Sequence, residues 1–317
     1  MDNLQHHIDH RKKEKRIGLA LGSGSARGWS HIGVIQCLLD AGIPIHLVCG
    51  SSMGAVVGGA YAAGILDALE DFAREFSWID FLKFMDVSLS RRGLLEGDNI
   101  TNFFREIISD KMIENLPLPY GAVAVDLLSG EEICFRKGPL LDAMRASFSL
   151  PGLFTPFERG QQWLIDGGLV NPVPVSLCRA MEADLVIAVN LNDDILGKNF
   201  SRKNSRINNG LHDKLFDVLH SDFLRNNLSF IKRFERPDEK TEKTPNMIEV
   251  MANAIYIMQD RITRQRLLED RPDILISPRL SAIGLLEFHK AREAIEAGWE
   301  STNSLIPSIL EQLGQIG

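Results

Sequence analysis

A strand-turn-helix pattern around a Gly-x-Ser-x-Gly sequence constrains the fold of this chain more than any other feature. Residues 47–49 are apolar, residues 50–54 read Gly-Ser-Ser-Met-Gly, and residues 55–63 are mostly small. A tight turn of this kind needs Gly50 and Gly54, because a Cβ there would crowd the reversing backbone, and it lifts Ser52 out of the sheet beside the positive end of the next helix. Ser52 is therefore a candidate nucleophile, although the five-residue pattern alone also fits an ordinary glycine-rich turn.

A second glycine-rich turn lies earlier in the chain. Residues 17–21 are predicted to form a short buried strand, and residues 22–28, Gly-Ser-Gly-Ser-Ala-Arg-Gly, lead into a helix that ends near residue 41. Backbone N–H groups gathered at such a turn suit an anion, either a phosphate or the oxyanion of a reaction intermediate. A dinucleotide-binding turn would need glycine where this chain has Arg27, and a Walker loop would need Gly-Lys-Ser or Gly-Lys-Thr. These differences favour the oxyanion interpretation.

Apolar runs and helical patterns alternate along the rest of the chain. The predicted strands lie at residues 122–128, 133–135, 162–165, 185–191 and 273–277. The predicted helices lie at residues 67–76, 98–108, 140–148, 174–181 and 247–269, and residues 285–313 are mostly helical. The alternation, with a continuous apolar strand at 185–191, predicts an α/β fold in which helices cover both faces of a mainly parallel central sheet, a three-layer α/β/α sandwich.

Charge and cysteine usage exclude some classes of protein. The net charge of −7 argues against a general nucleic-acid binder. The longest nearly uncharged stretch, residues 56–66, is far shorter than the roughly 20 apolar residues of a membrane span, and the N-terminal residues lack the apolar core of a signal peptide. The cysteines are widely separated and match neither a zinc site nor a disulfide framework. We therefore expect a cytoplasmic protein with no bound metal.

A serine nucleophile needs a base that takes its proton. An α/β-hydrolase would place an acid and then a histidine after the serine. The late histidines lie in predicted helices, however, and two others precede the serine. The histidines considered are His31, His46, His212, His220 and His289.

Asp166 is the candidate that remains. It directly follows the predicted strand at 162–165 and precedes Gly167 and Gly168, which allow close backbone approach. The same aspartate could instead form a turn with its own backbone. We favour Asp166 as a base that acts directly on Ser52. If the two strands are parallel, their carboxyl ends share one edge of the sheet, which would bring the two side chains together.

Four motifs, in this order, resemble those of the patatin-like phospholipase family, in its bacterial branch. They read GSGSARGWSHIGV at 22–34, GSSMG at 50–54, RASFSLPGLF at 145–154 and DGGLVNPVP at 166–174. The resemblance covers about residues 15–192. It implies a three-layer sandwich and a lipid acyl hydrolase that uses a Ser-Asp dyad with neither metal nor cofactor.

The resemblance also assigns roles to individual residues. Ser52 matches the nucleophile and Asp166 the aspartate of the Asp-Gly-Gly motif. The loop of Gly24, Ser25 and Ala26 matches the oxyanion hole. The supporting motif positions are Gly22, Arg27, Gly28, Gly50, Gly54, Gly167 and Gly168.

This chain departs from the family pattern in its first motif. The family often has an unbroken glycine run, whereas this chain has Ser23 and Ser25. Their backbone amides can still serve if the φ angles are negative, but a positive φ would imply strain or reduced activity. Arg27 could attract a phosphate headgroup, or it could anchor the loop through an ion pair.

The chain is expected to divide into four stretches. Residues 1–15 form a mobile polar tail and residues 16–192 the patatin-like catalytic core. Residues 193–245 are polar loops around an amphipathic helix at 211–234, which could pack on the sheet or serve as a lid, dimer contact or membrane face. Residues 246–317 complete the same domain.

The expected partners follow from the resemblance. They are a lipid or acyl-ester substrate, a peripheral contact with the inner face of the membrane and a second copy of the chain. A protein of this fold that binds lipid or regulates a partner with little or no turnover is the alternative.

Overall fold

The apolar runs of the sequence form the strands of one sheet, which the described residues build from eight strands. A computed structural model describes residues 15–77, 108, 111–151, 153–194 and 247–314 of the chain. The strands are β1 (Ile17–Leu21), β2 (Leu47–Ser51), β3 (Tyr120–Asp126), β4 (Glu132–Phe135), β5 (Phe157–Arg159), β6 (Gln162–Asp166), β7 (Leu185–Val189) and β8 (Ile274–Ile276).

The sheet is mainly parallel, with an antiparallel corner. Its strand order is β5-β6-β3-β2-β1-β7-β8, and β4 pairs with β3 off this path. Five neighbouring strands are parallel, namely β3, β2, β1, β7 and β8. Strands β4 and β6 both run antiparallel to β3, and β5 runs antiparallel to β6. The register places Asp166 opposite Ala124 and Ser51 opposite Val123. The ends of β2 and β6 therefore meet across β3.

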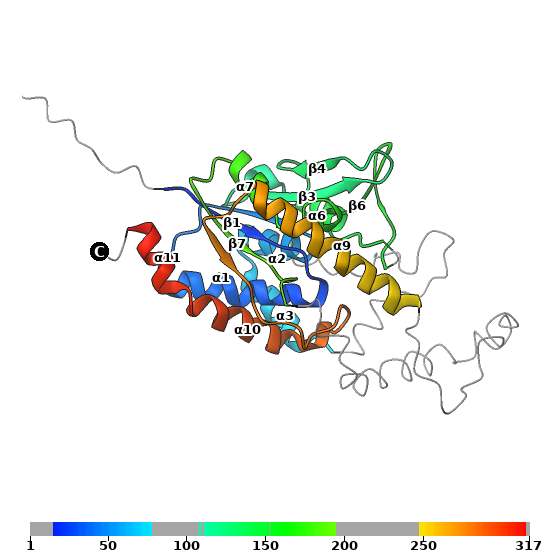
Figure 1. The fold of residues 1–317 in the computed structure, drawn as a ribbon. Helices are drawn as coiled ribbons and strands as arrows, with labels where there is room; N and C mark the ends of the chain where they lie inside the picture. The colour runs from blue at the N-terminus through cyan, green and yellow to red at the C-terminus, as the bar shows by residue number, and fades with distance from the viewer. Residues whose placement is uncertain (1–14, 78–107, 109–110, 152, 195–246, 315–317) are drawn as a thin grey trace, which may run out of the picture.

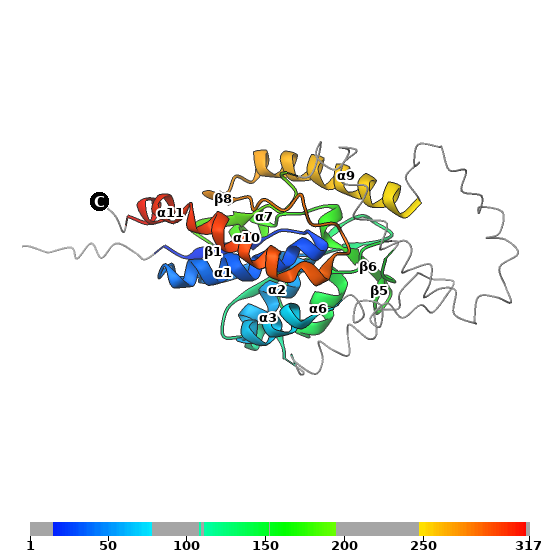
Figure 2. The ribbon, with the colours of Figure 1, turned by 90° about the horizontal axis from the view of Figure 1, so that it is seen from below.

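Helices cover both faces of the sheet (Figures 1 and 2). One face carries α1 (Ser30–Asp40), α2 (Met53–Ala62), α3 (Leu66–Glu75), α6 (Leu140–Ser147) and α10 (Ala291–Asn303). The other face carries α7 (Val175–Ala180) and the long α9 (Met247–Glu269), and α11 (Ile306–Leu313) ends the described chain. The three-layer α/β/α sandwich expected from the sequence is thus confirmed.

Alternating side chains of the buried strands supply the two halves of the core. In β1, Leu19 and Leu21 face the larger cluster with the α1 and α10 layer, whereas Ala20 faces the smaller cluster with α7. This alternation is what a strand covered on both faces requires. Because both faces of the sheet are covered, the candidate site lies at its edge, in the loops at the carboxyl ends of β1 and β2.

Most predicted elements agree with the structure to within a few residues. Strand β5 was not predicted, because it has three residues, half-buried or exposed. The helix expected at 211–234 lies outside the described residues, as does the one at 98–108 apart from Ile108. None of the helices in the described ranges combines the length and the apolar run needed to cross a bilayer.

Candidate active site

Ser52 lies on a tight turn between β2 and α2. Its backbone has φ 56° and ψ −126°, a conformation that a residue with a side chain rarely adopts. A Cβ at Gly50 would lie 2.3 Å from the carbonyl oxygen of Gly54, and one at Gly54 would lie 2.2 Å from that of Leu21. Both glycines are therefore required by the backbone. The strained serine on a strand-to-helix turn is the geometry of a nucleophile elbow.

The structure brings Ser52 and Asp166 together. The hydroxyl Oγ of Ser52 donates a hydrogen bond of 2.5 Å to Oδ2 of Asp166, across 114 positions of sequence. The backbone N–H of Gly168 donates to Oδ1 at 2.7 Å. Asp166 thus also forms a turn with its own backbone, and this turn leaves Oδ2 free to contact Ser52. Asp166 is fully buried and Ser52 is 3% exposed.

Burial sets the acidity of Asp166. It raises the pKa of this carboxyl from 3.8 to about 7, because the charged form loses its hydration, and the hydrogen bonds from Ser52 and Gly168 offset only part of this effect. A carboxylate with a pKa near neutrality is a stronger base than an exposed one. Asp166 is thereby suited to take a proton from Ser52 at physiological pH.

The end of α6 supports the turn at Ser52. The backbone N–H of Ser52 donates to Oγ of Ser147 at 2.9 Å, and the N–H of Asp166 donates to the carbonyl of Ser149 at 3.0 Å. Arg145 holds the same segment, with Nη1 donating to Oγ of Ser149 at 2.5 Å. The third motif thus contacts both candidate residues, which its residue types alone could not indicate.

The glycine-rich loop after β1 is anchored at its first two residues. The N–H of Gly22 donates to Val189 and that of Ser23 to Pro172. Nε2 of His31 lies 2.7 Å from the Gly22 carbonyl and donates to it. A Cβ at Gly28 would lie 2.1 Å from Cγ of Met53, so the end of this loop packs against the first turn of α2.

The predicted oxyanion residues differ in their backbone bonds. The N–H of Ala26 donates to the carbonyl of Leu285 at 3.2 Å, so this amide already has a hydrogen-bond partner, unlike the other two. Gly24 and Ser25 have N–H groups without a hydrogen-bond partner in the described part of the chain. The φ of Ser25 is 48°, in the region that favours glycine, whereas Ser23 has no positive φ. The strain anticipated from the sequence therefore applies to Ser25 alone.

Arg27 lies beneath the loop and not at an open surface. It is 1% exposed, its Nε donates to the Gly24 carbonyl at 3.3 Å, and its guanidinium lies over the ring of Tyr256, 4.4 Å from the centroid. Burial lowers its pKa. No carboxylate among the described residues forms an ion pair with it. Arg27 supports the loop through a backbone hydrogen bond and ring stacking.

The histidines that the structure describes have other partners. Burial lowers the pKa of His31 to about 4, so its ring is neutral while it holds Gly22. Nδ1 of His46 accepts from the N–H of Ile17. His289 lies in the short 3-10 helix Phe288–Lys290, and His212 and His220 lie outside the described residues. In the described ranges, no three His, Cys, Asp or Glu side chains gather as a metal site would need.

The chain is similar to known proteins over most of its length. The model of the family described as patatin-like phospholipase matches residues 19–179. An uncharacterized NTE family protein of Mycobacterium tuberculosis is 37% identical over 320 residues, covering 89% of each chain. The patatin-like phospholipase domain-containing protein 6 of Mus musculus is 34% identical over 181 residues, which cover 55% of this chain and 13% of that protein.

A solved structure supports the fold. The crystal structure of VipD from Legionella pneumophila matches with a TM-score of 0.54 and 14% identity, over 93% of this chain and 67% of that one. At this identity the likeness concerns the fold alone. The family match and the mycobacterial relative lead to one assignment: the chain belongs to the patatin-like phospholipase family.

Proposed function

We propose that this chain is a serine lipid acyl hydrolase that cleaves carboxylic ester bonds of phospholipids or lysophospholipids, with Ser52 as nucleophile and Asp166 as base. The observation that carries the proposal is the 2.5 Å hydrogen bond from Ser52 Oγ to Asp166 Oδ2 in a buried site. Donor and acceptor are already aligned for proton transfer, so the acylation step needs only the ester and the later deacylation step only water. Since phospholipids reside in bilayers, the proposal includes a peripheral contact with a membrane surface.

The first half of the reaction forms an acyl-enzyme. Ser52 Oγ attacks the ester carbonyl while its proton passes to Oδ2 of Asp166. The oxyanion of the tetrahedral intermediate accepts hydrogen bonds from the free N–H groups of Gly24 and Ser25. The intermediate collapses when the bond to the leaving alcohol breaks, and that alcohol takes the proton from Asp166.

The second half releases the fatty acid. A water molecule gives a proton to Asp166 and attacks the acyl carbonyl, and the same amides stabilise the new oxyanion. Collapse of this intermediate returns the proton to Ser52 and frees the carboxylic acid. Every proton in this cycle moves between Ser52, Asp166, the alcohol and water, so no cofactor is needed.

A screen of the purified chain tests the proposal. The protein is incubated with mixed phospholipids and lysophospholipids, and the released fatty acids and lyso products are identified by mass spectrometry, with Ser52→Ala as the control. A short-chain nitrophenyl ester gives a second readout. We expect turnover by the native chain and none by Ser52→Ala. Equal release by both would reject the proposal.

One observation favours a second candidate function. Ser25 has a φ of 48°, and the N–H of Ala26 already donates to the carbonyl of Leu285. Fewer amides are therefore available to an oxyanion than the family pattern implies. The alternative is a protein that binds lipid or regulates a partner with little turnover. It predicts that the native chain binds phospholipid vesicles but releases no fatty acid in the same screen.

A further inference from the structure

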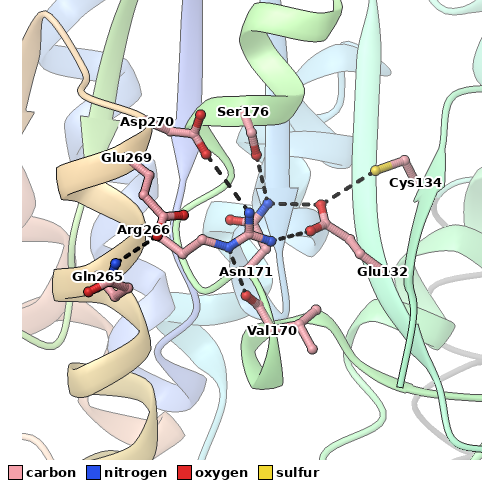
Figure 3. A network of polar contacts seen from close by, with 9 residues as sticks. All are labelled: Glu132, Cys134, Val170, Asn171, Ser176, Gln265, Arg266, Glu269 and Asp270. Carbon is pink, nitrogen blue, oxygen red and sulfur yellow. Dashed lines mark hydrogen bonds and ion pairs between the residues drawn. The ribbon is translucent and has the colours of Figure 1, made fainter. Parts of the chain in front are cut away.

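The second half of α9 lies beside the loop that carries Val170 and Asn171 (Figure 3). Nε of Arg266 donates to the carbonyl oxygen of Val170 at 3.1 Å, and Nη2 of the same side chain pairs with the carboxylate of Glu132 on β4. Its Nη1 lies 3.9 Å from Oδ2 of Asp270, the residue that directly follows α9. One guanidinium thus joins α9, the loop and β4. It lies outside the segment that the family model matches.

Glu132 also binds the far end of the loop. Nδ2 of Asn171 donates to Oε1 of Glu132 at 2.9 Å and to Oγ of Ser176 at 3.0 Å. The backbone N–H of Asn171 donates back to the carbonyl of Gly167 at 2.9 Å. The loop is therefore closed on itself and fixed by three side chains, of which Arg266 and Glu132 lie outside it and Asn171 belongs to it. We call Arg266, Glu132 and Asn171 the loop clamp.

A second contact between α9 and the loop lies at Gly168. A Cβ at Gly168 would lie 2.7 Å from Nε2 of Gln259 and 2.8 Å from Oγ of Ser23. Gly168 is the residue whose N–H holds Oδ1 of Asp166. A shift of the loop against α9 would therefore move the donor that orients the carboxylate.

We propose that Arg266 is a positioning residue, which holds the loop between Gly167 and Asn171 against β4 and thereby keeps the carboxylate of Asp166 aligned with Ser52. The inference rests on the proposed function of Asp166 as the base. An arginine suits this role because its planar fork can serve a carbonyl and a carboxylate at the same time, whereas a lysine is a single point charge.

The clamp acts through geometry and not through its charge. Among the described groups, those that shift the pKa of Asp166 are the Ser52 hydroxyl and the Gly168 N–H, besides burial itself, and no charged side chain contributes. The charged groups of the clamp and its surroundings are Arg266, Glu132 and Asp270. Arg266→Lys keeps the positive charge and removes the fork, so it separates the two effects.

The experiment compares Arg266→Lys with Arg264→Lys in the full chain. Arg264 is the matched control, because it pairs with Asp260 on the same helix at 2.9 Å and its side chain is 60% exposed. The pKa of the Asp166 carboxyl is followed by 13C NMR, with the signal assigned by its loss in Asp166→Asn. We expect Arg266→Lys to raise this pKa by about half a unit or more, because a displaced Gly168 N–H stabilises the ionised form less. Arg264→Lys should leave it unchanged.

Steady-state kinetics give the second readout. In Arg266→Lys, we expect kcat for a nitrophenyl ester to fall about tenfold, while KM stays within about twofold of the native value. Misplaced reacting groups slow the chemical step but leave substrate binding nearly unchanged. A native pKa and a native kcat in Arg266→Lys would overturn the proposal, and so would a loss of thermal stability alone. If the native chain cleaves no ester, the proposed function fails, but the NMR titration still decides whether Arg266 positions Asp166.

Glu132→Gln provides an independent variant. The glutamine keeps an acceptor oxygen for Asn171 but loses the negative charge that Arg266 binds. No charged side chain among the described residues shifts the pKa of Asp166, so loss of the Glu132 charge by itself should leave this pKa unchanged, whereas a loosened loop would raise it. A rise in the pKa of Asp166 supports the clamp, and an unchanged or lower pKa contradicts it.

Discussion

The backbone N–H of Gly168 donates a hydrogen bond of 2.7 Å to Oδ1 of Asp166, so the loop that follows this carboxylate also orients it. The bond occupies one carboxylate oxygen and leaves the other, Oδ2, for Ser52. With both oxygens bound, the carboxylate cannot rotate without breaking a hydrogen bond. In the proposed mechanism the aspartate is thereby oriented before any substrate arrives, as efficient proton transfer requires.

The acidity of Asp166 predicts how ester hydrolysis depends on pH. Burial raises the pKa of this carboxyl to about 7, and only its ionised form can accept the proton of Ser52. We expect kcat/KM to rise about tenfold per pH unit below pH 7 and to level off above it, since kcat/KM reports the free enzyme. The measurement uses a nitrophenyl ester between pH 5 and pH 9, corrected for spontaneous hydrolysis. A plateau that begins near pH 4 would contradict the raised pKa.

The same pKa predicts a pH-dependent stability. Between the unfolded value of 3.8 and the folded value of about 7, the unfolded chain has released the proton of Asp166 and the folded chain still holds it. The free energy of unfolding therefore falls as pH rises through this window, by about 4 kcal/mol in all at about 1.4 kcal/mol per pKa unit. This contribution is fully present below pH 3.8 and is lost above about pH 7.

Replacement of Asp166 by asparagine isolates that contribution. Asp166→Asn cannot ionise, so its stability relative to the native chain should increase from pH 4 to pH 8. Urea unfolding at several pH values measures the difference, and other titrating groups cancel because both proteins share them. Two stability curves that run parallel over this range would show that Asp166 is ionised in the folded state well below pH 7.

The sequence predicted the meeting of Ser52 and Asp166 but for the wrong reason. The expectation rested on parallel strands whose carboxyl ends share one edge, whereas β6 runs antiparallel to β3 and places Asp166 opposite Ala124. The pairing arises because the end of β6 approaches the end of β2 across one intervening strand. Strand direction depends on the path of the chain between motifs, which the motifs themselves do not encode.

Contacts between distant segments account for what the sequence could not predict. The turn at Ser52 is local, so its glycines and small residues were sufficient to identify it. The use of the Ala26 amide by Leu285 and the stacking of Arg27 on Tyr256 join the glycine-rich loop to the last third of the chain. Nothing in the spacing of the four motifs indicates these partners. A polar residue such as Arg266 on a long helix likewise looks like a solvated side chain until its partners are known.

Catalysis is expected to proceed without histidine. His31 is neutral and bound to the Gly22 carbonyl, and His46 is bound to the backbone of β1. Single replacements should keep esterase activity within about tenfold of the native chain, less than the 10²- to 10⁴-fold typical of a lost general base. The histidines to replace are His31, His46, His212, His220 and His289. His31→Gln is the suitable variant at the first position, since its amide can still donate to Gly22. A loss of several orders of magnitude in one folded variant would instead support a triad.

Ser52 and Asp166 are expected to behave as one catalytic unit. Ser52→Ala removes the nucleophile, and Asp166→Asn leaves the hydroxyl without a base, so each change alone should abolish acyl-ester hydrolysis. The activity of the double variant should then be little lower than that of either single variant, because the second change removes a group that no longer contributes to catalysis. The measurement is kcat/KM for the same nitrophenyl ester in all four proteins, with circular dichroism to show that each is folded. Losses that multiply in the double variant would mean that the two residues act in separate steps, and an active Asp166→Asn enzyme would remove the aspartate from the mechanism.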